Sequence, residues 1–294
     1  MENLRYEIRI NRIQLKALED TCTFAFNLHN GIMLSTVVKW SMAAYRRHYK
    51  EHYHTEPDDT DMAHTTEFLY RLCSELKRMG WNCADIFENG KEIVSPIMTC
   101  RYDELNLMAK DFHRAMRLRV GDTRKVGDII SIRRINSATK QPTYLVSVNN
   151  SQLKWLSSSC EQYSRFITGQ FDYTLQDAGE EAWEQRYVAT HPLREDGRKD
   201  FGIGTPEWDD VRNRTKEIIN DIRWTCWRCS PNSSYGIHYD EYSDMLWDMY
   251  EVFRHQLWLD RPEDKKVNYT VDAYPACRWS DQSLPMISKE VEVK

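Results

Sequence analysis

The stretch NRIQLKALEDTC, at Asn11–Cys22, returns in altered form as NNSQLKWLSSSC at Asn149–Cys160. When residues 6–33 are aligned without a gap to residues 144–171, eight positions are identical, where chance alone gives about two. Such a match at one fixed offset predicts that the chain contains an internal repeat. The identical pairs are Tyr6/Tyr144, Asn11/Asn149, Gln14/Gln152, Leu15/Leu153, Lys16/Lys154, Leu18/Leu156, Cys22/Cys160 and Gly31/Gly169.

A second block of the chain repeats in the same order. The apolar positions of residues 105–116 recur at residues 242–253, and the tripeptide Tyr-Asp-Glu precedes each block. Blocks that keep their order and nearly keep their offset predict a tandem duplication. We therefore place a first repeat, the more diverged one, at residues 1–140 and a second repeat at residues 141–294.

Each repeat begins with a predicted strand and continues with predicted helices. YEIRINR (6–12) and YLVSVNN (144–150) alternate apolar and polar residues with the period of a half-buried strand. The residues that follow switch to the three-and-four spacing of a helix face. A closing strand is predicted at residues 126–134, and a weaker one at residues 266–274. We expect an α+β fold dominated by helix, in which two strand–three-helix–strand units pack as a pseudo-dimer.

An Asn stands three residues before a Gln in both repeats, as Asn11/Gln14 and Asn149/Gln152. The side-chain oxygen of an Asn at the N-cap accepts a backbone N–H of the first helical turn. A Gln three residues later can reach back to the N–H of the cap, which completes a capping box. The repeated motif therefore predicts the start of a helix and not a doubled ligand site.

Two adjacent carboxylates follow a Tyr in each repeat, at Asp103-Glu104 and Asp240-Glu241. Acidic residues are favoured in the first turn of a helix by the exposed N–H groups and the helix dipole. The same residue types also serve as acid–base pairs in enzymes. We expect them to mark a helix start in each repeat, and to be catalytic only if both acids point into a pocket.

Charge and cysteine usage limit the classes of function. With 40 basic and 45 acidic residues the net charge is −5, which offers no basic field to hold a nucleic-acid backbone. The chain does not open on a signal-like segment, and no apolar run reaches 18 residues. We expect a cytosolic protein whose eight cysteines are mostly free and buried. A membrane and direct nucleic-acid binding are not expected, whereas homo-oligomerisation stays open.

Catalytic and metal-binding motifs are absent or incomplete in the sequence. Cys226 and Cys229 have the spacing of half a zinc site, to which His238 or Cys277 could add ligands. The first repeat does not keep both cysteines, and no second CxxC exists. GxSxG, HExxH and a phosphate-binding glycine loop are all missing. We expect no cofactor, no metal and no catalytic residue, and leave zinc at Cys226 and Cys229 open.

The stretch CSPNSSYGIHYDEY, at Cys229–Tyr242, is the part of the second repeat that packing explains least. Its Pro, Asn, Ser and Gly residues predict a loop, and loops on a rigid scaffold often carry recognition. The corresponding loop of the first repeat is shorter and lacks the Asn-Ser-Ser. We expect a binding site specific to the second repeat, made of Asn232, Ser233, Ser234, Tyr235, His238, Tyr239, Arg254 and His255.

The second repeat resembles small proteins encoded in phage and prophage genomes. The resemblance covers about residues 144–288, and the first repeat carries a diluted version of it. It implies a phage protein that works in the cytoplasm of the infected bacterial host. It rests on Gln152-Leu153, Cys160, Arg165-Phe166, Gly169-Gln170, the Asn232–Gly236 loop, YEVFRHQLW at Tyr250–Trp258, and Cys277 followed by Leu284–Ile287.

Phage accessory proteins without enzyme motifs are often inhibitors of host defence. In size and character the chain is similar to the Gabija anti-defence protein, a binding protein that assembles around the Gabija nuclease complex. The resemblance thus implies an inhibitor of a bacterial anti-phage defence system that acts by protein–protein binding. The ten Trp and sixteen Tyr residues suit such an interface.

Two alternatives from other classes of function are kept. The first is a small-molecule binder that sequesters a nucleotide immune signal in a pocket between the repeats, with Tyr235, Arg254 and His255. The second is a metal-dependent nuclease or hydrolase that uses His238, Asp240 and Glu241.

Overall fold

The computed structural model describes most of the chain, and it confirms the predicted α+β class and the dominance of helix. The description covers residues 5–29, 33–79, 96–126, 130–135, 142–170, 202–228 and 241–290, with residues 183, 187–188, 190–191, 193–195 and 197.

The chain forms two compact units, and each unit draws on both halves of the sequence. The sheet unit comprises residues 1–26, 100–165 and 239–294, and the helical unit comprises residues 27–99 and 166–238. The opening strand, the first helix after it and the last long helix of each predicted repeat belong to the sheet unit. The intervening helices belong to the helical unit.

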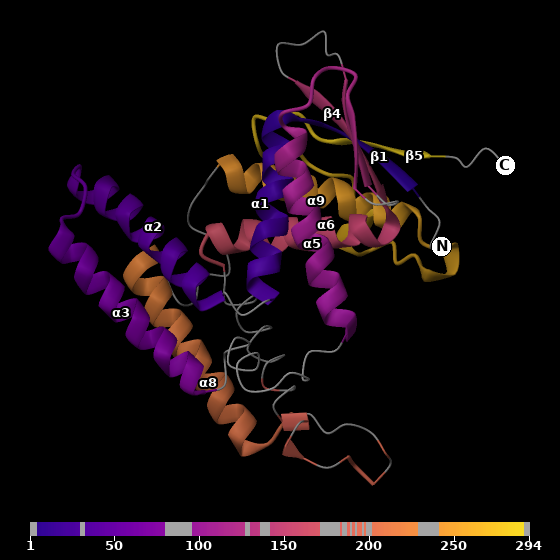
Figure 1. The fold of residues 1–294 in the computed structure, drawn as a ribbon. Helices are drawn as coiled ribbons and strands as arrows, with labels where there is room; N and C mark the ends of the chain where they lie inside the picture. Colours follow the sequence, from indigo (N-terminus) through magenta and orange to yellow (C-terminus); the bar gives the residue numbers. More distant parts are fainter. Residues whose placement is uncertain are drawn as a thin grey trace. The chain divides into compact units, whose positions relative to one another are not determined.

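The sheet unit contains an antiparallel sheet whose described strands follow the order β2-β3-β4-β1-β5. Three of them, β1, β4 and β5, are labelled in Figure 1. The two strands predicted from the period-two pattern, β1 and β4, form the centre of the sheet. The closing strand predicted at residues 126–134 corresponds to β3 over residues 130–134, whereas Val126 belongs to β2 and pairs with Ile130. The bounds are β1 (Arg5–Asn11), β2 (Thr123–Val126), β3 (Ile130–Ile135), β4 (Thr143–Asn149) and β5 (Met286–Glu290).

The strand register has a local twofold symmetry. Ile8 of β1 pairs with Val146 of β4, which is the residue aligned with it in the second repeat. On their outer sides Ile8 pairs with Ile287 of β5, and Val146 pairs with Ile132 of β3. The opening strand of each half therefore pairs with the closing strand of the other half.

The helices that follow β1 and β4 begin with the predicted capping boxes. In the first, the N–H of Gln14 donates to Asn11 Oδ1 at 2.9 Å, and the N–H of Asn11 donates to Gln14 Oε1 at 3.0 Å. The same two bonds measure 2.8 Å and 2.9 Å between Asn149 and Gln152. Both motifs thus satisfy N–H groups that a helix start leaves without partners.

Aligned side chains of the two halves supply the core of the sheet unit. The buried face of β1 and β4 packs against helices that carry apolar stripes at aligned positions. Figure 1 labels these helices α1, α5, α6 and α9. Their bounds are α1 (Arg12–His29), α5 (Pro96–Ala115), α6 (Asn150–Ile167) and α9 (Glu241–Leu259). Buried aligned pairs include Tyr6/Tyr144, Ile8/Val146, Ile10/Val148, Leu15/Leu153, Leu18/Leu156, Cys22/Cys160, Met108/Met245 and Phe112/Met249.

The helical unit is built from α2, α3 and α8, with a short π-helix, η1, continuing α8. Thr205 caps α8 through its hydroxyl, which accepts the N–H of Trp208 at 3.2 Å, and Pro206 occupies the first turn. Trp227 of η1 is buried, and its indole N–H donates to Ser41 Oγ of α2 at 3.2 Å. The bounds are α2 (Met33–Tyr53), α3 (Asp59–Arg78), α8 (Pro206–Ile222) and η1 (Arg223–Trp227).

Two predictions of element bounds are wrong. Residues 266–274 form no strand: they lie around the 3-10 turns η2 (Glu263–Lys265) and η3 (Val271–Ala273), and β5 follows later in the chain. Their alternating pattern is overridden because side chains of α9 bind the backbone there. In addition, α5 begins at Pro96, so Asp103 and Glu104 lie inside the helix, whereas Glu241 does begin α9.

The described cysteines are free, as expected. Cys22, Cys73, Cys160 and Cys226 are buried, whereas Cys277 is exposed. Burial raises the pKa of Cys73 to about 11 and the pKa of Cys160 and Cys226 to about 12, so these thiols stay protonated at neutral pH.

Within the described ranges, no helix has the length and apolar character that a membrane span requires.

Candidate functional site

The segment between α9 and β5, residues 260–285, has little regular structure but many exposed apolar side chains. We call this segment the C-terminal arm. Five of the fifteen exposed large hydrophobic residues of the described chain lie on it. Tyr269 is 89% exposed, and Tyr274 and Trp279 are 61% and 60% exposed. The other two are Val267 and Val271.

Carboxylates of α9 hold the C-terminal half of the arm. Asp248 is buried, and its two oxygens accept the backbone N–H groups of Trp279 and Ser280 at 2.7 Å and 3.0 Å. The Ser280 hydroxyl also donates to Asp248, at 2.6 Å. One turn further along α9, Glu251 accepts the N–H of Cys277 at 2.9 Å. Ionised acceptors make hydrogen bonds that are stronger than neutral ones, so the arm is firmly attached here.

Basic residues of α9 hold the N-terminal half of the arm. The Arg254 guanidinium donates to the carbonyl oxygen of Val271 and lies 3.2 Å from Glu251. His255 Nδ1 lies 3.0 Å from the carbonyl oxygen of Asp272, and because a carbonyl can only accept, Nδ1 carries the proton. The Asp272 carboxylate pairs with Arg261 at 2.8 Å.

The capping box of α1 also contacts the end of the arm. The amide nitrogen of Gln14 donates to the carbonyl oxygen of Ser283 at 2.6 Å. The amide nitrogen of Asn11 donates to Gln282 Oε1 at 3.1 Å. In the second repeat the equivalent amide of Gln152 donates to Glu104 of α5 instead, at 3.0 Å. The shared motif therefore has a different tertiary partner in each half.

The structure places two of the predicted binding residues at the arm. Arg254 and His255 are bound to the chain's own backbone, as described above. Of the residues suggested for catalysis, Glu241 accepts the N–H of Asp281 at 2.8 Å. The remaining predicted residues lie outside the described part of the chain: Asn232, Ser233, Ser234, Tyr235, His238, Tyr239 and Asp240.

The zinc suggestion is only partly within the described residues. Cys226 is buried as a free thiol, and Cys229 lies outside the description. Among the described residues, no three His, Cys, Asp or Glu side chains are grouped so that they could hold a metal ion. Glu104, the described member of the first carboxylate pair, binds Gln152 and lies inside α5.

The alternation of residues 266–274 predicts a strand, so the sequence pattern does not reveal that Tyr269 and Tyr274 lie exposed on an irregular arm. A signal is present in YTVDAYPACRW, at Tyr269–Trp279, where three aromatic residues are separated by segments that contain Asp272 and Pro275, residue types typical of turns. An irregular segment that is held rigidly and presents aromatic side chains is typical of recognition surfaces. No protein-family model, curated protein or solved structure matches the chain.

Proposed function

We propose that this protein binds another protein, and that it is a phage inhibitor of a bacterial anti-phage defence system. The observation that carries the proposal is the C-terminal arm, which presents Tyr269, Tyr274 and Trp279 to solvent. Tyrosine and tryptophan supply much of the binding energy of protein interfaces when a partner covers them. The arm is already held on α9 by hydrogen bonds before a partner binds, which lowers the entropy cost of association.

The resemblance of the second repeat to phage proteins supports the choice of partner. The Gabija nuclease complex is the first partner to test, and the infected bacterial cytoplasm is the place where the two would meet.

We further propose that the chain arose by tandem duplication and packs as a pseudo-dimer, which the exchanged closing strands and aligned capping boxes support. The binding function would then belong to the second repeat, since the arm follows α9.

The test is co-purification from bacteria that express the tagged chain together with a Gabija defence system. We expect the wild-type chain to capture the nuclease complex and to restore phage plaques. A triple variant with Tyr269→Ser, Tyr274→Ser and Trp279→Ser should lose both effects while it keeps its thermal midpoint. The matched control is Tyr70→Ser on α3, whose side chain is 60% exposed but lies off the arm. Failure of the wild-type chain to capture the complex would refute Gabija as the partner.

A further inference from the structure

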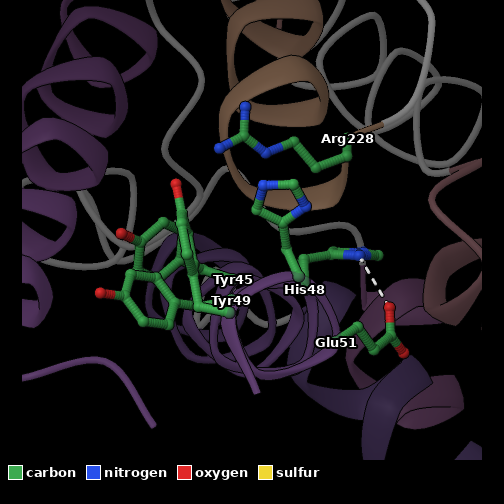
Figure 2. A pocket seen from close by; sticks show the side chains of 7 residues that line it. Tyr45, His48, Tyr49, Glu51 and Arg228 are labelled. Carbon is green, nitrogen blue, oxygen red and sulfur yellow. Dashed lines mark ion pairs between the residues drawn. The ribbon is translucent and has the colours of Figure 1, made fainter. Parts of the chain in front are cut away.

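The helical unit contains a pocket of about 610 Å³ that the proposed function does not use. Most of its lining comes from the second half of α2, and Arg228 reaches it from the end of η1 (Figure 2). Its volume lies in the range of about 300–1,000 Å³ that is usual for small-molecule sites. The lining residues are Tyr45, His48, Tyr49, Glu51, His52, Tyr53 and Arg228.

The α2 side of the pocket is aromatic. Tyr45, Tyr49 and Tyr53 stand four residues apart, so they share one face of the helix. The ring centroids of Tyr45 and Tyr49 are 5.9 Å apart, and those of Tyr49 and Tyr53 are 4.6 Å apart. The Asp61 carboxylate of α3 raises the pKa of Tyr49. Neighbouring ring planes are inclined by 52° and 46°, so each phenol ring offers a separate face on which a planar ring can stack.

The lining of the pocket also contains a cation, Arg228, whose backbone conformation is unusual. Arg228 follows the π-helix η1 and adopts the left-handed conformation, with φ 51° and ψ 29°. A residue with a Cβ rarely adopts this conformation, and both π-helices and such outliers concentrate at functional sites. The backbone is held because the N–H of Arg228 donates to the carbonyl oxygen of Arg223 and the preceding Trp227 is buried against Ser41.

The Arg228 side chain has unused binding capacity. Its guanidinium makes no hydrogen bond or ion pair with any residue that the structure describes, and the residue is exposed. Glu51, the carboxylate among the described lining residues, lies 3.3 Å from His48 Nδ1, so it is already engaged. A guanidinium offers paired N–H donors that match the oxygens of a phosphate.

From this combination we propose that the pocket binds a small phosphorylated aromatic molecule of the nucleoside monophosphate class. The base stacks on the tyrosine face of α2, and the phosphate binds Arg228. This inference does not rest on the proposed protein-binding function, because the pocket lies in the helical unit and the arm lies in the sheet unit.

Isothermal titration calorimetry of the full-length chain tests the proposal with AMP, adenosine and inorganic phosphate as separate probes. We expect AMP to bind, and adenosine and phosphate each to bind at least about tenfold more weakly, since each keeps only one of the two contacts. GMP and CMP, tested in the same way, show which base the tyrosine face prefers. Absence of AMP binding at about 1 mM, or phosphate binding as tightly as AMP, would overturn the proposal.

Two substitutions separate binding from folding. Arg228→Gly removes the guanidinium and places at that position the residue that tolerates its φ best, so the thermal midpoint should not fall. We expect it to weaken AMP binding at least about tenfold, and Tyr53→Ala to weaken it as well. Lys50→Ala is the matched control, because this α2 cation pairs with Glu56 and does not line the pocket. Unchanged AMP affinity in Arg228→Gly would overturn the assignment.

Discussion

At the scale of single residues, the two aligned tyrosines of the central strands differ in the hydrogen bonding of their hydroxyl groups. Tyr6 and Tyr144 are both fully buried. The Tyr6 hydroxyl donates to Asp260 Oδ2 at 2.8 Å, whereas the Tyr144 hydroxyl has no partner among the described residues. We expect Tyr6→Phe to lower the free energy of unfolding by about 1–2 kcal/mol, because a bond to a charged acceptor is lost. Tyr144→Phe should leave it unchanged or raise it by up to about 1 kcal/mol, because an unsatisfied buried hydroxyl is removed.

Urea unfolding followed by circular dichroism measures both variants. The two substitutions remove the same atom from aligned positions, so each serves as the control for the other. If both variants lose the same free energy of unfolding, the prediction is contradicted, because only the Tyr6 hydroxyl is bonded to Asp260.

Asp260 gives the sheet unit a pH-dependent contribution to stability. Burial alone would raise the pKa of this carboxyl, but hydrogen bonds from Gln256, Lys289 and Tyr6 outweigh it and lower the pKa. A folded-state pKa below the unfolded one, about 3.9, gives stability that is complete above that value and is lost as the pH falls through the folded pKa. We expect Asp260→Asn to be less stable than wild type at pH 6, and the gap in thermal midpoint to shrink toward pH 3. A gap that is constant with pH would contradict the prediction.

At the scale of elements, the attachment of the C-terminal arm depends on Asp248. This carboxylate is buried and accepts two backbone N–H groups and a hydroxyl from Trp279 and Ser280. We expect Asp248→Ala to release residues 277–282, because two buried donors lose their acceptor at about 1–3 kcal/mol each. Hydrogen exchange should then speed up in the arm, whereas β1 and β4 stay protected. Glu263→Ala, on the exposed η2 turn, is the control and should change neither region.

The elements also show which structural features the sequence predicts and which it does not. The capping boxes of α1 and α6 follow from Asn and Gln three residues apart, because a helix start is set by local hydrogen bonds. The position of β5 was missed because it is decided by the free edge of β1, far away in sequence. The arm was missed for the same reason, since its conformation depends on carboxylates of α9. Likewise, Arg228 meets the tyrosines of α2 only in the folded helical unit.

At the scale of the whole chain, the strand pairing makes the two halves dependent on each other. Both neighbours of β1, namely β4 and β5, lie in residues 141–294. Residues 1–140 alone would keep the β2–β3 hairpin but leave β1 without a partner. The compact units likewise combine segments of both halves, so neither half contains a complete core. Sequence alignment predicts two repeats but gives no information on which strands pair.

Separate expression of residues 1–140 and residues 141–294 tests this dependence. We expect neither half to unfold cooperatively as a monomer, because an unpaired apolar strand exposes backbone groups and core side chains to water. Co-expressed halves should co-purify as a one-to-one complex with the helical circular dichroism of the intact chain, since β1 then regains both partners. A half that pairs with a second copy of itself would agree with the proposed duplication, because the register places Ile8 opposite its own counterpart Val146. A stably folded monomer of residues 1–140, detected by analytical ultracentrifugation with cooperative urea unfolding, would show instead that the exchanged strands are not needed for folding.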